Sequence, residues 1–187
     1  MDEKDRKIIS ILQRIAHPTL SEIGEAVGMS AMGAKKRLDK LKKEKIIKST
    51  ALVNVEKLGI LTAVLAMEVE SSEALERLLE KFRNCPRIIR FFVTTGSYNL
   101  FALIWAEDLS SLESVTLEKC SLRSQPGIRR YEVYPIQEIH YEPFLEIKAT
   151  EKKVESAPCG VDCASCSRYK ANRCLGCPAI TLYRGRL

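Results

Sequence analysis

Residues 20–30 read Leu20-Ser21-Glu22-Ile23-Gly24-Glu25-Ala26-Val27-Gly28-Met29-Ser30, and they carry the signals of a helix, a turn and the start of a second helix. Thr19 stands just before this stretch and Glu22 follows it by three residues, which is the capping-box pattern of a helix start. The first helix is predicted over residues 20–27. Gly28 permits a sharp turn, and Ser30 can cap the next helix over residues 31–45. This order is the helix-turn-helix pattern.

The flanking segments complete a small domain around this pattern. Apolar side chains precede it at three- and four-residue spacing and predict an amphipathic helix that ends at His17-Pro18: Ile8, Ile9, Leu12, Ile15 and Ala16. Residues 46–50 and 51–55 have the composition of two short strands, which would form a wing beside the helices. The first domain is therefore predicted over residues 1–60.

The helix predicted over residues 31–45 has two unlike faces. One face is apolar, with Ala34, Leu38 and Leu41, and the opposite face carries Met32, Lys35, Lys36, Asp39 and Lys43. From Ser30 to Lys48 there are eight basic and two acidic residues. Such a face attracts DNA phosphates, and a helix of this shape fits the major groove. Basic helix faces are also often only solvated surface, but the preceding turn and helix favour DNA binding here.

These segments resemble the Lrp/AsnC family of transcription regulators. The resemblance rests on residues 2–9, residues 20–30, Arg37-Leu38-Asp39-Lys40-Leu41, Lys45-Ile46-Ile47-Lys48 and Val55-Glu56-Lys57-Leu58-Gly59. It implies contacts with double-stranded DNA from Ser30, Ala31, Met32, Lys35 and Lys36, with Arg37 and Lys40 beside them. Arg37 has a second interpretation, in which it holds the helix against its neighbours. A two-fold dimer would place two such helices about 34 Å apart on one face of the duplex.

Residues 61–148 alternate between strand and helix patterns. Apolar runs over residues 61–69, 88–94, 100–106 and 128–139 predict strands, and residues 72–82 and 109–117 predict helices. The order βαββαβ is that of the ferredoxin-like fold, so an α+β protein is expected. This order also resembles the effector-sensing domain of the Lrp/AsnC family. The resemblance implies a dimer or higher homo-oligomer and a small-molecule effector such as an amino acid.

The effector site implied by this resemblance is the loop of Gly96, Ser97, Tyr98 and Asn99. An acidic residue is common in the family where this chain has Ser97. The alternative is a plain hairpin turn, in which Gly96 supplies a positive φ and Asn99 is an ordinary turn residue. Both interpretations stay open on the sequence.

Five of the seven cysteines fall within 19 residues near the end of the sequence: Cys159, Cys163, Cys166, Cys174 and Cys177. Residues 149–157 are predicted to be a linker and residues 158–187 a cysteine-rich metal-binding module. The spacing contains two C-x2-C pairs, and each pair can present two thiolates on one side of a tight turn. Gly160 and Gly176 would permit such turns. The pattern resembles small modules with the sequence C-G-x-D-C-x-x-C-x-x-Y-x-x-x-x-C-x-G-C-P.

Two metal centres fit this spacing. Four thiolates can hold Zn²⁺ in a closed structural site, and four can equally hold a [4Fe-4S] cluster. Five cysteines leave one beyond the usual four ligands, whereas Cys85 and Cys120 stand alone in the sequence. Free or disulfide-bonded thiols are a third interpretation, although a reducing compartment favours metal thiolates. A cluster would make DNA binding sensitive to oxygen or redox state, whereas zinc would make this module, called the tail below, a structural or partner-binding piece.

Composition and motifs narrow the function further. The chain has 187 residues, a net charge of +6 and 45% hydrophobic residues, without an apolar run long enough for a membrane span. The start of the sequence has no secretory pattern, so a cytoplasmic protein is expected. His17 and His140 belong to no catalytic pattern, and no catalytic residue is assigned. Sirohaem decarboxylases resemble the same two-domain fold, but the basic helix and the cysteines favour a DNA-binding regulator that is not an enzyme.

Overall fold

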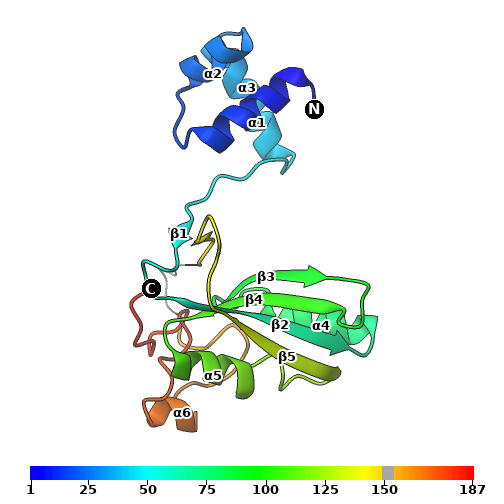
Figure 1. The fold of residues 1–187 in the computed structure, drawn as a ribbon, viewed down its shortest axis with the longest axis vertical. Coiled ribbons are helices and arrows are strands. Elements are labelled where there is room, and N and C mark those ends of the chain that lie inside the picture. The colour runs from blue at the N-terminus through cyan, green and yellow to red at the C-terminus, as the bar shows by residue number, and fades with distance from the viewer. Residues whose placement is uncertain (149–153) are drawn as a thin grey trace. The chain divides into compact units, whose positions relative to one another are not determined.

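The computed structural model describes residues 1–148 and 154–187. These residues form two compact units, Met1–Thr50 and Ala51–Leu187 (Figure 1). The sequence predicts a boundary after residue 60 and a separate module from residue 158. The structure divides the chain after Thr50 instead, and it includes the cysteine-rich segment in the second unit. Among the helices of these described residues, none is long and apolar enough to cross a membrane.

The first unit consists of α1 (Glu3–Arg14), α2 (Leu20–Val27) and α3 (Ala31–Lys43). Each helix begins after a residue whose side chain accepts a backbone N–H of the first turn: Asp2, Thr19 and Ser30. Gly28 ends α2 with a φ of 66°, as the predicted turn requires. The apolar stripes of the three helices meet in one core, made of Ile8, Ile11, Ile23, Val27, Ala34 and Leu41. The helix-turn-helix prediction is confirmed.

Gly24 allows α2 and the following turn to approach closely. A Cβ on Gly24 would lie 2.7 Å from the backbone oxygen of Met29. Backbone cannot yield to such a contact as the end of a flexible side chain can, so this position has no room for a larger residue. Sequence reasoning did not single out Gly24 for this role.

Two helix ends differ from the prediction. α1 ends at Arg14 rather than at His17, because Ile15 has an extended backbone and is 52% exposed. α3 ends at Lys43 rather than at Lys45, because Lys45 has a φ of 56°, outside the right-handed helical region. The apolar spacing that predicted longer helices therefore continues past the residues that are helical.

The wing prediction is wrong. Residues 46–52, all of them described, contain no strand. The short strand β1 (Val53–Asn54) pairs instead with β6 (Phe144–Leu145), in the second unit. The partner of β1 lies about ninety residues further along the chain, which a local pattern of apolar residues cannot reveal.

The second unit is built on a four-stranded antiparallel sheet. Its elements follow the predicted order: β2 (Leu61–Val69), α4 (Ser72–Phe82), β3 (Ile88–Val93), β4 (Leu100–Ala106), α5 (Leu109–Leu117) and β5 (Ile128–Ile136). The strands lie in the order β3-β4-β2-β5. This is the ferredoxin-like arrangement, and the predicted fold class is confirmed. β5 ends at Ile136, three residues earlier than expected.

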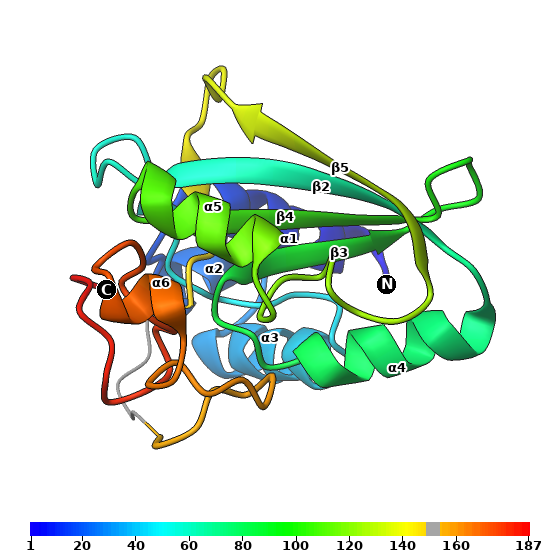
Figure 2. The ribbon, with the colours of Figure 1, turned by 90° about the horizontal axis from the view of Figure 1, so that it is seen from below.

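The two faces of this sheet differ. Helices α4 and α5 cover one face (Figure 2), and the main core lies between them and the sheet: Ala63, Leu65, Met67, Leu78, Phe82, Leu100, Ala102, Ile104 and Leu112. Because side chains alternate along a strand, the intervening residues point to the opposite face. There a second core around Val55, Trp105 and Ile147 covers one part of the face. Elsewhere Phe92 and Tyr134 are each 50% exposed. This remaining part, the uncovered face, offers apolar surface to solvent.

The cysteine-rich segment packs on the second unit and contains one short helix, α6 (Ser167–Lys170). Val154 forms a parallel bridge with Ile180, so the two ends of this segment meet. The predicted linker over residues 149–157 falls partly on residues 149–153, which lie outside the described residues. In its described part, Ala157 is buried. Gly160 and Gly176 have φ values of 76° and 88°, as the predicted turns require.

Candidate functional sites

The first candidate site is the polar face of α3. Lys35, Lys36 and Lys40 are exposed, and Met32 near the helix start is 62% exposed. Lys40 lies 3.8 Å from the carboxylate of Glu44. Within the described residues, neither Lys35 nor Lys36 has a carboxylate partner. This face therefore presents positive charge that is not neutralised inside the first unit.

Ser30 and Ala31 lie at the N-terminal end of the same helix. The Ser30 hydroxyl oxygen accepts the N–H of Gly33 at 3.2 Å. A hydroxyl that accepts a capping bond can still donate its own proton. The helix start is thus accessible and retains a hydrogen-bond donor, as a contact with base edges or phosphates requires.

Arg37 is engaged inside the first unit. Its Nη1 donates to Oδ2 of Asp2 at 2.7 Å and to Oδ1 of Asp5 at 2.8 Å, so α3 is joined to the N-terminal cap of α1. Backbone N–H bonds within that cap, together with the Arg37 guanidinium, hold the pKa of both carboxyl groups below the usual range. These contacts fit the interpretation in which Arg37 holds the helix against its neighbours.

The loop predicted to bind an effector is a hairpin connection between β3 and β4. The Asn99 side chain donates to the Val69 carbonyl and accepts the Val69 N–H, both at 2.8 Å. Tyr98 donates its hydroxyl proton to Glu132. Gly96 and Ser97 are exposed at the tip. Gly96 is not among the glycines with a positive φ, so the expected reason for a glycine there is wrong.

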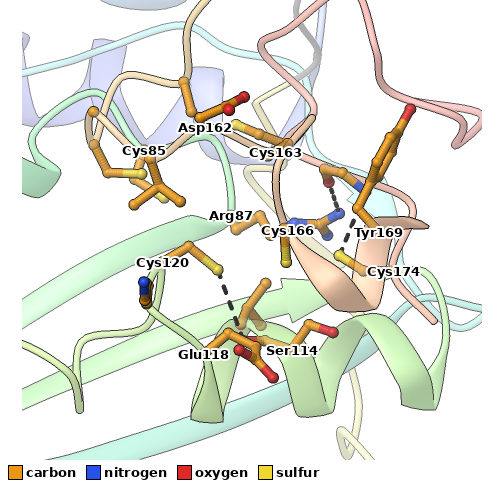
Figure 3. A pocket seen from close by; sticks show the side chains of 18 of the residues that line it. Cys85, Arg87, Ser114, Glu118, Cys120, Asp162, Cys163, Cys166, Tyr169 and Cys174 are labelled. Carbon is orange, nitrogen blue, oxygen red and sulfur yellow. Dashed lines mark hydrogen bonds between the residues drawn. The ribbon is translucent and has the colours of Figure 1, made fainter. Parts of the chain in front are cut away.

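The second candidate site is a cavity of about 490 Å³ in the second unit (Figure 3). All seven cysteines of the chain line it. Five come from the cysteine-rich segment, as the sequence predicted: Cys159, Cys163, Cys166, Cys174 and Cys177. The other two are Cys85, after α4, and Cys120, after α5. Sequence reasoning missed these two, because nothing in their local sequence indicates that the cysteine-rich segment packs beside them.

The rest of the cavity wall is mostly apolar. Side chains from the sheet and its helices contribute Leu65, Phe82, Ile88, Ile104, Val115 and Leu122. The charged residues that line the cavity are Arg87, Glu118, Lys119 and Asp162. The cavity therefore combines a concentration of sulfur atoms with few other ligands for a metal ion.

The environment of the thiols favours their neutral form. Burial raises the pKa of Cys120 to about 12 and that of Cys177 to about 12. Burial also raises the pKa of Cys85 and Cys163. A thiophilic cation would have to displace these protons, since the thiolate is the form that binds metals.

One backbone N–H group is directed at a sulfur atom of the cavity. The nitrogen of Gly176 lies 3.4 Å from Sγ of Cys174. A hydrogen bond of this kind stabilises a thiolate.

The separation of the ligands distinguishes two kinds of metal centre. In the part of the chain that the structure describes, no three His, Cys, Asp or Glu side chains lie close enough to share one metal ion. Thiolates around a single Zn²⁺ stand about 2.3 Å from the ion, so their sulfurs lie within about 4 Å of each other. A [4Fe-4S] cluster binds one thiolate on each iron and spreads its ligands more widely. As they stand, the described thiols do not surround a single ion.

Arg87 anchors the cysteine-rich segment to the sheet. Its side chain is 6% exposed and lies 2.8 Å from the carboxylate of Glu107, and its Nη2 donates to the Gly176 carbonyl at 2.7 Å. Glu107 also accepts the hydroxyl proton of Tyr183. The guanidinium stands 5.2 Å from the ring centre of Trp105. This buried network fixes the segment that carries Cys174 and Cys177.

A second anchor joins the same segment to α5. Arg168 donates from Nε to Ser114 Oγ and from Nη2 to a Glu113 carboxylate oxygen, each at 2.7 Å. The backbone N–H of Leu175 donates to Ser111 Oγ at 3.3 Å. The segment is therefore held by specific polar contacts from α6 and from the residues that follow it.

Known protein families match both units. Residues 1–42 match the AsnC-type helix-turn-helix domain, and residues 62–144 match the Lrp/AsnC ligand binding domain. An uncharacterized HTH-type transcriptional regulator of Pyrococcus horikoshii is 30% identical over 121 residues, which are 64% of this chain and 76% of that protein. The HTH-type transcriptional regulator LrpA of Pyrococcus abyssi is 28% identical over 120 residues, 64% of this chain and 85% of LrpA.

Solved structures share the fold. AsnC of Escherichia coli superposes with a TM-score of 0.65 at 21% identity, over 75% of this chain and 95% of AsnC. A transcriptional regulator of Neisseria meningitidis in complex with L-Met superposes with a TM-score of 0.66 at 22% identity. That alignment covers 76% of this chain and 93% of the Neisseria chain.

A helix-turn-helix unit followed by a ferredoxin-like ligand-binding unit defines a transcriptional regulator. The chain belongs to the Lrp/AsnC family of HTH-type transcriptional regulators. Its relatives are named as regulators and not as enzymes, so the sirohaem decarboxylase alternative is not favoured. Both family matches end before the cysteine-rich segment.

Proposed function

We propose that this regulator acts in the cytoplasm and binds specific sequences in double-stranded DNA through α3. The exposed Lys35 and Lys36, which have no carboxylate partner among the described residues, carry the proposal. Ser30, Ala31 and Met32 at the helix start would contact base edges, and Lys40 would contact phosphate. Arg37 would act indirectly, since its charge is paired with Asp2 and Asp5.

The regulator would bind DNA as a dimer or higher oligomer. The uncovered face of the sheet, with Phe92 and Tyr134 half exposed, supports pairing with a second copy. Two copies related by a two-fold axis would present two α3 helices to neighbouring half-sites.

A small molecule would modulate the second unit. The Neisseria meningitidis structure contains L-Met, which supports an amino acid as the class of effector. The loop of Gly96, Ser97, Tyr98 and Asn99 is the proposed site, with the exposed Gly96 and Ser97 free to contact a ligand. Asn99 would support the loop, because its amide is already bonded to Val69.

A metal centre would occupy the cysteine-lined cavity. The five cysteines Cys159, Cys163, Cys166, Cys174 and Cys177 would supply thiolates to a [4Fe-4S] cluster, with zinc as the alternative. The fact that all five line one cavity supports a metal centre there. When bound, such a cluster can change oxidation state or be lost to oxygen, and the regulator would then respond to redox conditions.

The DNA proposal is tested with the double variant Lys35→Ala/Lys36→Ala. Binding to selected genomic fragments is measured at several salt concentrations. Because each phosphate contact contributes about 0.9 to the slope of log affinity against log salt, the slope should fall by about 2 for each protomer that contacts DNA. The control is Arg6→Ala/Lys7→Ala, which removes two exposed charges from α1. An unchanged slope in the α3 variant would contradict the proposal.

The metal proposal is tested by anaerobic purification, metal analysis and visible absorption. About four irons per chain with a brown colour would support the cluster. One zinc per chain would support the alternative, and a metal-free protein after anaerobic purification would contradict both.

A further inference from the structure

Two of the seven thiols in the cavity belong to the ferredoxin-like part of the second unit. Cys85 follows α4 and Cys120 follows α5, whereas the other five cysteines are in the segment from residue 154 onward. A cysteine-rich module that folded around its own metal would turn its thiols inward and away from the neighbouring domain. Here the five thiols face a space that the sheet and its helices close from the other side.

Cys120 lies among the thiols of the tail. It lines the same cavity as Cys159, Cys163, Cys166 and Cys174. Its thiol also donates to the Ser114 carbonyl at 3.7 Å, a weak bond that a stronger ligand could replace. Figure 3 shows Cys120 on the α5 side of the cavity, facing Cys166 and Cys174 across it.

Cys85 lies on another side of the same cavity. It lines the cavity together with Cys159 and Cys177. The backbone of its loop is held by the N–H of Ile88, which donates to the Cys85 carbonyl at 3.3 Å. The sulfurs of the tail are therefore flanked by one thiol from each of two neighbouring loops.

We propose that the metal centre is shared, with Cys85 and Cys120 of the ferredoxin-like part acting as ligands beside thiols of the cysteine-rich segment. This inference rests on the proposed metal centre. It assigns to the cavity a polynuclear, thiolate-bound centre of the iron–sulfur class. It also gives the centre a structural consequence, since bonds to both parts would hold the tail against α4 and α5.

The test is the double variant Cys85→Ala/Cys120→Ala in the full chain, which keeps all five cysteines of the tail. The control is Val115→Ala, which trims an apolar wall of the same cavity and leaves every thiol in place. Wild type and both variants are reconstituted anaerobically with ferrous iron and sulfide. We measure the iron bound per chain, the sulfur-to-iron absorption in the visible range, and the protection of residues 159–177 from amide hydrogen exchange.

We expect the double variant to lose the visible absorption or shift it, and to expose residues 159–177 to exchange, while Val115→Ala resembles wild type. Titration with Co²⁺ provides a second readout, since thiolate-to-cobalt absorption reports the number of bound sulfurs. The affinity of the double variant for Co²⁺ should be at least about tenfold lower than that of wild type. Loss of a residue that only supports a metal ligand already costs about 10–100-fold.

The other outcomes overturn the inference in distinguishable ways. If wild type and the double variant bind the same metal with the same spectrum, the five tail cysteines suffice, and the proposed metal centre stands without Cys85 and Cys120. If wild type binds neither iron nor cobalt, the proposed metal centre fails together with the inference. If Val115→Ala loses the metal as fully as the double variant, the effect comes from packing, and the inference fails.

Discussion

Lys36 and Arg37 are neighbours in the sequence, yet their side chains have different roles. Lys36 is exposed and has no carboxylate partner in the described residues, whereas Arg37 bridges Asp2 and Asp5. The guanidinium can donate to both carboxylates at once, which an ammonium group on a flexible stem does less well. One basic run therefore contains both a candidate contact with DNA and a contact that holds the helices together.

We expect Arg37→Met to lower the stability of the first unit and to weaken its dependence on acid. The pKa of Asp2 and Asp5 is lowered in the folded protein, by the backbone N–H bonds and by Arg37. The stabilisation is therefore present above the ordinary aspartate pKa of about 4 and is lost as the pH falls through the folded values. Thermal unfolding from pH 7 to pH 3 should show the two proteins converging at low pH.

Lys36→Met serves as the control for this comparison, because it removes a neighbouring positive charge that has no partner in the described chain. Its melting temperature should follow that of wild type over the same pH range. If Lys36→Met and Arg37→Met behaved alike, net charge rather than the ion pairs would account for the effect.

We expect Arg87→Met to destabilise the second unit by about 3 kcal/mol, because it leaves the largely buried carboxylate of Glu107 without its cation. The Gly176 carbonyl would lose its donor as well. Denaturant unfolding measures the change. The double variant Arg87→Met/Glu107→Leu removes both charges and should recover part of the loss. A double variant less stable than Arg87→Met would contradict this account of the pair.

At the scale of the element, α2 and the turn after it depend on a glycine that has no room for a side chain. We expect Gly24→Ala to destabilise the first unit by about 1–3 kcal/mol, because its Cβ would lie 2.7 Å from the Met29 oxygen. Gly33→Ala in α3 is the matched control. A Cβ there meets no atom closer than 3.5 Å, so the higher helix propensity of alanine should be neutral or stabilising. Thermal unfolding of both variants separates the two cases.

The sequence predicted most elements because their signals are local. Asp2, Thr19 and Ser30 cap the helices that follow them, and alternating or periodic apolar residues mark the buried faces. The errors arise where a distant contact sets the pairing of a strand or a single backbone angle sets the end of a helix. β1 pairs with β6 from far along the chain, and Lys45 ends α3 by a left-handed φ that lysine rarely adopts.

At the scale of the whole molecule, the uncovered face of the sheet predicts the oligomeric state. We expect wild type to sediment as a dimer or larger species and Phe92→Glu to shift it towards the monomer, because a carboxylate would be buried at the interface. Leu109→Glu is the control, since Leu109 is an exposed leucine of α5, on the other side of the sheet. An unchanged sedimentation profile for Phe92→Glu would place the contact between copies elsewhere.

The candidate metal site was predictable only in part. The short spacing of the five tail cysteines predicts that they share one site, because the two residues of a C-x2-C pair are close in sequence. Cys85 and Cys120 reach the same cavity through the packing of the tail against α4 and α5, which depends on the buried pair of Arg87 and Glu107. Contacts of that kind depend on three-dimensional packing, and no spacing rule encodes them.

The arrangement of the cavity also has a consequence for how the protein is made. Translation proceeds from the amino end, so Cys85 and Cys120 are synthesised before the cysteine-rich segment that covers them. Until the cysteine-rich segment has been synthesised, the nascent polypeptide exposes two thiols on an apolar surface. The proposed metal centre could be enclosed only afterwards, so its insertion would be a late step of maturation, and both thiols would be open to oxidation until then.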